Sequence, residues 1–169
     1  MHKFPVSTAI LVAAMLTLIL PAQVSALPQE LQTKIGNVYV VSTITGEAKT
    51  IVGGQTIVVP AVLELKCRVT WVGDRFILFR IEGGSLRLDQ TTCKIIDGWW
   101  RGAYDKGTEK SVIEAYAVDG AGVRIHFILF GDDARHTVGG TYMTIRGGLK
   151  DGQGNYWSVN IKAWRFKAS

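Results

Sequence analysis

AVLELKCRVTWV, residues Ala61–Val72, alternates apolar and polar side chains along its length. Successive side chains of a β-strand point to opposite faces, so this alternation predicts a strand with one buried face. The predicted buried face consists of Leu63, Leu65, Cys67, Val69 and Trp71. The predicted exposed face consists of Val62, Glu64, Lys66 and Arg68. The stretch therefore favours a β fold with a wet side and a dry side.

The chain from Ile35 onward continues in the same manner, with short runs of Val, Ile, Thr and aromatic residues and no helical period. Turn signals rich in glycine separate the runs, namely Gly53-Gly54, Gly73-Asp74, Gly83-Gly84 and Asp97-Gly98. Because short turns join antiparallel neighbours, we predict an all-β fold of about 8–10 strands, a single antiparallel β-barrel or β-sandwich. The repeated tetrapeptide FILF, at Phe76–Phe79 and Phe127–Phe130, predicts two central strands that are covered on both faces.

The N-terminus has the features of a secretory signal peptide. Lys3 precedes the apolar run Ala9–Leu20, and Val24 and Ala26 occupy the −3 and −1 positions of a cleavage site. We predict a signal peptide over residues 1–26, a polar lead-in over 27–34 and a single β domain over 35–169. The predicted localisation is secreted or extracytoplasmic, and an uncleaved anchor is the alternative.

The chain has two cysteines, Cys67 and Cys93, and an exported pair normally oxidises. We therefore predict a Cys67–Cys93 disulfide. A flat meander that turns at Gly83-Gly84 would hold the two residues too far apart, so the disulfide requires a bend between Leu88 and Cys93. The alternative is a pair of buried thiols that pack as small apolar groups.

The charged residues exclude some classes of function. The formal net charge is +5, but the basic residues are scattered, whereas nucleic-acid binding needs a concentrated basic patch. Charges such as Arg80 and Glu82 interrupt the strands and argue against a lipid-facing outer-membrane barrel. The sequence has no P-loop, no nucleophile elbow and no zinc-protease motif, so no cofactor and no catalytic residue is predicted.

Two polar stretches resemble metal-binding loops. Asp132, Asp133 and His136 are predicted to share one loop, where carboxylates and an imidazole could bind a divalent ion, although solvated loop acids are the alternative. DGQGN at Asp151–Asn155 resembles part of a calcium loop but lacks the distal acid of an EF-hand. A Gly/Asn-rich hairpin turn is the preferred interpretation of this second stretch.

Adjacent aromatic residues indicate a binding surface. Strand alternation sends one ring of each adjacent aromatic pair outward, where it can stack on a sugar or line a cavity. The candidate binding residues are Trp99, Trp100, Tyr104, Tyr156 and Trp157. Core packing is the alternative role for any one of these rings.

We predict from these features a secreted, non-catalytic β domain whose aromatic residues bind a small apolar molecule or a carbohydrate. One alternative is a structural or adhesive surface protein, with a cell-surface partner or a second copy of the chain. Another alternative is a small-barrel enzyme of the cyclase or isomerase type, with Glu114, His126 or Arg124 as its reactive groups.

Overall fold

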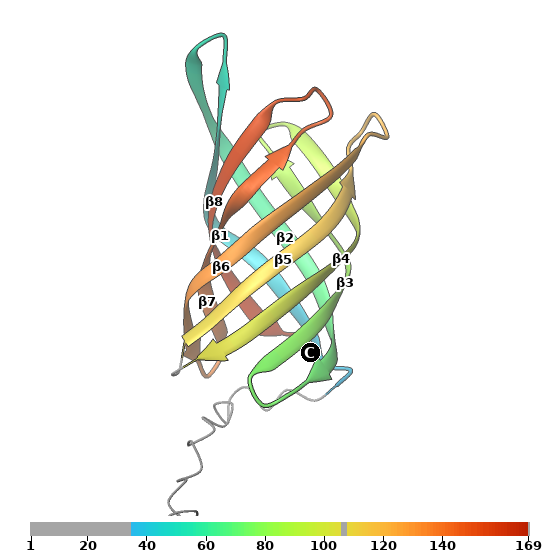
Figure 1. The fold of residues 1–169 in the computed structure, drawn as a ribbon, viewed down its shortest axis with the longest axis vertical. Coiled ribbons are helices and arrows are strands. Elements are labelled where there is room, and N and C mark those ends of the chain that lie inside the picture. The colour runs from blue at the N-terminus through green and yellow to red at the C-terminus, as the bar shows by residue number, and fades with distance from the viewer. Residues whose placement is uncertain (1–34, 106–107, 169) are drawn as a thin grey trace, which may run out of the picture.

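The computed structural model describes residues 35–105 and 108–168 (Figure 1). The predicted signal peptide and polar lead-in, residues 1–34, lie outside the described residues. Eight strands make up the fold: β1 (Val38–Val52), β2 (Gln55–Val72), β3 (Phe76–Leu88), β4 (Thr91–Asp105), β5 (Thr108–Val118), β6 (Arg124–Thr137), β7 (Gly140–Lys150) and β8 (Tyr156–Lys167). Within the described ranges, no helix is long and apolar enough to span a membrane.

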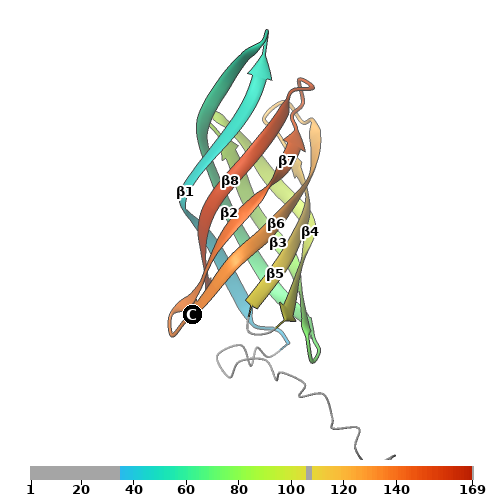
Figure 2. The same ribbon diagram turned by 60° about the vertical axis from the view of Figure 1, so that its left-hand side comes forward.

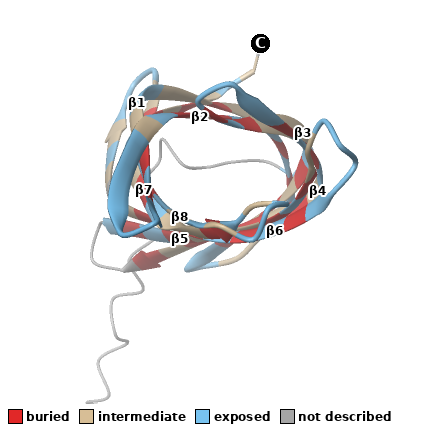
Figure 3. Cartoon of the chain, turned by 90° about the horizontal axis from the view of Figure 1, so that it is seen from above, coloured by how far each residue is buried: buried red, intermediate tan, exposed pale blue. Residues whose placement is uncertain are grey.

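The strands form a closed antiparallel barrel in which each strand pairs with the next and β8 pairs with β1. The view along the barrel shows this closed ring (Figure 3). The all-β prediction is therefore confirmed, and of its two architectures the barrel is correct. Short hairpins explain the strand order, because each brings consecutive strands side by side. The β1–β2 hairpin extends beyond the others at the end away from the C-terminus (Figure 2).

Turn positions differ from the prediction in the first half of the chain. Gly53-Gly54 forms the expected two-residue turn, with φ of +57° and +80°. Gly83-Gly84 instead lies inside β3, and the chain turns at Asp89-Gln90, where Asp89 has φ +53°. A side chain at Gly84 would collide with the backbone oxygen of Glu64, so this glycine permits close strand approach and does not mark a turn.

Because some predicted turns lie inside strands, the strands are longer than the sequence suggested. Asp97-Gly98, also predicted as a turn, lies within β4. A Cβ atom at Gly98 would be only 2.5 Å from the backbone oxygen of Glu114 on β5. The fold therefore has eight long strands, the lower limit of the predicted 8–10.

The core fills the barrel interior with every second side chain. Leu63, Leu65, Cys67 and Val69 are buried as predicted, but a register shift after Val69 leaves Trp71 49% exposed. The sequence suggested that the two FILF segments are covered on both faces, and this prediction is wrong. Phe79 and Phe127 are buried inside, while Phe130 is exposed on the outer wall, because one barrel has one interior.

The predicted disulfide is wrong, although the chain does turn between Leu88 and Cys93, at Asp89-Gln90. Cys67 and Cys93 are free, buried thiols. Cys67 pairs with Ile81 on β3, and Ile81 pairs with Gly98 on β4. Cys93 lies five residues along β4 from Gly98, roughly 16 Å at strand spacing, which exceeds the roughly 7 Å limit between bridged Cα atoms.

Both thiols should be protected in the native protein. Burial raises the pKa of Cys67 to about 12 and also raises the pKa of Cys93, so neither forms much of the reactive thiolate at neutral pH. We expect slow reaction with an aromatic disulfide reagent in buffer and two fast-reacting thiols after denaturation without reductant. A Cys93→Ser variant should lose one of the two. Absence of titratable thiol in denatured protein would restore the disulfide.

Candidate functional site

A polar cluster lies inside the barrel at the end that contains the β6–β7 turn and the C-terminus. Five strands contribute one side chain each: Tyr104 from β4, Glu109 from β5, His136 from β6, Thr141 from β7 and Arg165 from β8. Glu109, Thr141 and Arg165 are buried polar residues in a predominantly apolar interior. Because buried charges are rare unless they are paired, this cluster is the strongest indication of a functional site.

Glu109 and Arg165 form its centre. Arg165 Nη1 donates to Glu109 Oε1 and Nη2 donates to Oε2, each at 2.7 Å, which is the two-pronged geometry of a strong ion pair. The Tyr104 hydroxyl donates to Glu109 Oε2 at 3.0 Å. The guanidinium also lies 5.4 Å from the Phe79 ring and 5.0 Å from the Trp100 ring, which adds cation–π attraction.

The protonation states follow from this geometry. Burial alone would lower the pKa of Arg165, but the charge and hydrogen bonds of Glu109 raise it above its usual range, so the guanidinium stays charged. Burial, assisted by the negative charge of Glu109, raises the pKa of Tyr104, so its hydroxyl stays protonated. Tyr104 is therefore a fixed hydrogen-bond donor at neutral pH and a poor proton source.

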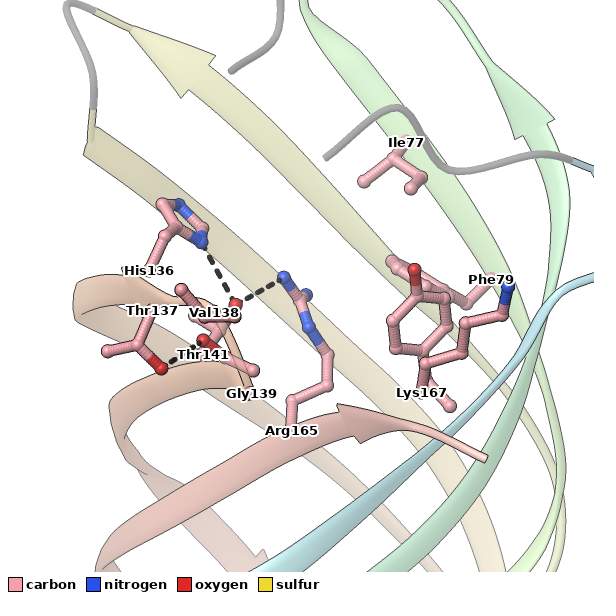
Figure 4. A pocket seen from close by; sticks show the side chains of 11 residues that line it. Ile77, Phe79, His136, Thr137, Val138, Gly139, Thr141, Arg165 and Lys167 are labelled. Carbon is pink, nitrogen blue, oxygen red and sulfur yellow. Dashed lines mark hydrogen bonds between the residues drawn. The ribbon is translucent and has the colours of Figure 1, made fainter. Parts of the chain in front are cut away.

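Thr141 links the ion pair to His136. Arg165 Nη2 lies 3.4 Å from Thr141 Oγ1, and His136 Nδ1 lies 2.9 Å from the same oxygen (Figure 4). A guanidinium has no acceptor, so Thr141 accepts from Arg165 and its own proton is available to His136 Nδ1. His136 Nε2 lies 3.9 Å from Glu109 Oε2, which is within ion-pair distance but beyond hydrogen-bond distance.

A cavity of about 300 Å³ opens beside this network. Its apolar wall contains Tyr39, Ile77 and Phe79, and its polar wall contains His136, Thr141 and Arg165. Residues 137–140 of the β6–β7 turn and Lys167 complete the lining. Figure 4 shows Arg165 extending from β8 between Thr141 on one side and Phe79 on the other. The cavity thus combines an apolar surface with a preorganised polar end.

The predicted aromatic residues do not form one site. Trp100 is fully buried and Tyr104 almost so; Tyr104 belongs to the polar cluster, and the Trp100 ring contacts Arg165 of that cluster. Trp99 faces outward, with the Arg80 guanidinium 4.6 Å from its ring. Tyr156 and Trp157 lie at the opposite end of the barrel, in the first two positions of β8.

The β7–β8 turn lies at that opposite end. It contains DGQGN, which forms the hairpin turn that was the preferred interpretation of this stretch. Asp151 accepts hydrogen bonds from the backbone N–H groups of Gln153 and Asn155 and, at 2.8 Å, from Trp157 Nε1. Burial alone would raise the pKa of Asp151, but these bonds lower it below its usual range. The Asp151 oxygens therefore organise the turn.

The suggested metal ligands lie in β6 and not in a loop. His136 faces inward to Thr141, whereas Asp132 stands opposite Thr144 of β7, and the side chain of Asp133 is not described. Among the described residues, no group of three or more His, Cys, Asp or Glu could hold a metal ion.

The residues suggested for an enzyme lie outside the interior. Glu114 Oε1 is 3.2 Å from His126 Nε2, and its Oε2 is 3.5 Å from Arg101, in an exposed cluster on the outer wall. Arg124 is exposed in the first position of β6. None of the three lines the cavity.

Sequence reasoning missed Glu109 and Arg165, although a signal was present. Arg165 continues the inward row Val159, Ile161 and Ala163 of β8. Glu109 likewise begins a row that continues with Ser111, Ile113, Ala115 and Ala117. A charge in register with an apolar row predicts a buried partner of opposite charge.

The adjacent tryptophans should differ in their contribution to stability. We expect Trp100→Ala to lower the free energy of unfolding by about 3–5 kcal/mol, because it leaves a cavity in the core. Trp99→Ala should cost about 1 kcal/mol or less, since only an outer-wall contact with Arg80 is lost. Urea unfolding of both variants measures the difference, and equal losses would contradict the assigned orientations.

Glu109 should be far more important for stability than a surface glutamate on the same strand. Glu109→Gln leaves the Arg165 charge buried without a carboxylate, and we expect a loss of about 3–5 kcal/mol. Glu114→Gln, the matched control on the outer wall, should cost about 1 kcal/mol or less. Urea titrations at neutral pH provide the comparison. Similar losses in the two variants would refute the buried pair.

Comparison with known proteins identifies the fold but no family. No protein-family model matches the chain, and no curated protein matches it. Among solved structures, the chain is similar to DynF from the dynemicin biosynthesis pathway of Micromonospora chersina. The TM-score is 0.51 and the identity 12%, over 76% of this chain and 79% of DynF. At this identity the likeness shows a shared barrel fold.

Proposed function

We propose that this protein binds a small, mainly apolar organic molecule in the cavity at the β6–β7 end of the barrel. The observation that supports this most is the placement of an apolar wall against a buried, preorganised polar cluster. Small-molecule sites commonly have this composition, and a volume of about 300 Å³ is at the lower end of their range. The barrel fold that the chain shares with DynF, a protein of a biosynthesis pathway, is compatible with such a role.

Binding is favoured over catalysis by the state of the polar groups. The Glu109 carboxylate accepts two hydrogen bonds from Arg165 and one from Tyr104, so most of its roughly four lone-pair sites are engaged. A general base must lie within hydrogen-bond reach of the substrate proton, whereas Glu109 lies behind the cavity lining, and a general acid needs a pKa near the working pH. The raised pKa of Tyr104 makes it a weak acid, so neither group is suited to proton transfer.

A small apolar molecule is favoured over a carbohydrate by the positions of the aromatic rings. Sugar recognition would use exposed rings that share one surface, whereas Trp99 and Tyr156 lie on different parts of the barrel. Tyr39 and Phe79 lie together in the cavity, with ring centroids 5.7 Å apart. Export from the cytoplasm is a second part of the proposal and rests on the sequence of residues 1–26.

The proposal predicts a specific effect of filling the cavity. Phenylnaphthylamine, a neutral dye that fluoresces in apolar surroundings, should bind the wild-type protein. Ile77→Trp places a large ring in the cavity and should weaken this binding at least about tenfold, or about 1.4 kcal/mol. Leu78→Trp, the matched control, adds the same ring on the opposite face of β3 and should leave the affinity unchanged.

Fluorescence titration measures the affinities, and circular dichroism with thermal melts verifies that both variants fold. Absence of dye binding to the wild type would refute the proposal. Dye binding that survives in a folded Ile77→Trp variant would place the dye elsewhere and would refute the cavity as the site.

A further inference from the structure

We infer that the ligand is an organic anion, with an apolar body inside the barrel and a carboxylate-like oxygen group facing Arg165 and Lys167. The inference rests on the proposed function and specifies the chemical class of its ligand. It follows from the balance of charge at the cavity, the supply of hydrogen-bond donors and the contrast between the two ends of the barrel.

The charge balance at the cavity is positive. Arg165 and Lys167 line it, whereas none of the lining residues is acidic. Glu109, behind the lining, pairs with Arg165 through both oxygens and so neutralises that one cation. In the described part of the chain, Lys167 makes no ion pair. An anionic ligand would supply the missing counter-charge.

The cavity end of the barrel also has a buried hydrogen-bond donor without an acceptor in the described part of the chain. Trp100 Nε1 is buried and has no hydrogen-bond partner among the described residues. Its ring contacts Phe79 and Arg165, two residues of the cavity wall. An indole N–H and an ammonium group can only donate, and the Glu109 oxygens are already engaged. A ligand that carries oxygen acceptors would therefore complement this end of the barrel.

The position of Lys167 suits an amphipathic molecule. Lys167 is exposed, two residues beyond the buried Arg165 on β8, and its backbone pairs with that of Tyr39 on β1. The ligand can therefore keep its charged group partly hydrated beside Lys167 while its apolar body contacts Ile77 and Phe79. This arrangement avoids the desolvation cost of a fully buried second charge.

The other end of the barrel has the opposite character. A cavity of about 170 Å³ there is lined by Asp119 and Asp151 and by no basic residue. Asp119 accepts hydrogen bonds from two backbone N–H groups, as Asp151 does, so both belong to their turns. The two ends thus differ in the sign of their charge, which would direct an anion to the β6–β7 end.

Two dyes that differ by one charged group test the inference. Anilinonaphthalene sulfonate has the skeleton of phenylnaphthylamine and carries an added sulfonate. We expect Lys167→Gln to weaken sulfonate-dye binding roughly three- to tenfold and to leave the neutral dye unchanged. Lys110→Gln, which removes the same charge from the outer wall of β5 at the same end, is the matched control and should change neither affinity. Ile77→Trp should abolish binding of both dyes.

The possible outcomes separate the two proposals. If the neutral dye does not bind the wild type, the proposed function fails. If the neutral dye binds in the cavity but the sulfonate dye does not, the proposed function stands and the anion inference is overturned. The inference is also overturned if Lys167→Gln affects the two dyes equally, or if Lys110→Gln weakens the sulfonate dye as much as Lys167→Gln does.

Discussion

The pairing of β1 with β8 creates the enclosed interior on which every other feature depends. It runs from Tyr39 opposite Lys167 to Lys49 opposite Ser158 and leaves the sheet without a free edge. Because side chains alternate along each strand, closure turns one face of the sheet into a single core. It also brings Arg165, near the end of the chain, within 2.7 Å of Glu109, which lies 56 residues earlier.

The ion pair between these residues gives the interior its functional character. Two buried charges offset the cost of leaving water only when their hydrogen bonds are nearly complete, and here Tyr104 and Thr141 complete them. Such a network adds little net stability relative to an apolar core of the same volume, although removal of one partner is costly. It rigidly presents a guanidinium beside an apolar wall. A cavity at this position therefore has a preformed polar end and requires little rearrangement to receive a ligand.

Local patterns predicted the strands well but located the turns and the site poorly. The alternation of Leu63, Leu65, Cys67 and Val69 depends only on side-chain direction, so it was readable directly. Glycine has two structural uses, positive φ at Gly53 and close backbone approach at Gly98, and a single sequence cannot distinguish them. Aromatic residues were similarly ambiguous, since the adjacent Trp99 and Trp100 have opposite surroundings.

The amino-acid order alone established an antiparallel β protein with one dry face, because hydrophobic alternation is a property of consecutive residues. It could not establish the free state of Cys67 and Cys93, because their separation depends on the register of three strands. Nor could it identify the cavity, whose wall combines Phe79, Thr141 and Arg165 from three strands. Closure and register decide which distant residues meet, and both are set by the packing of the whole barrel.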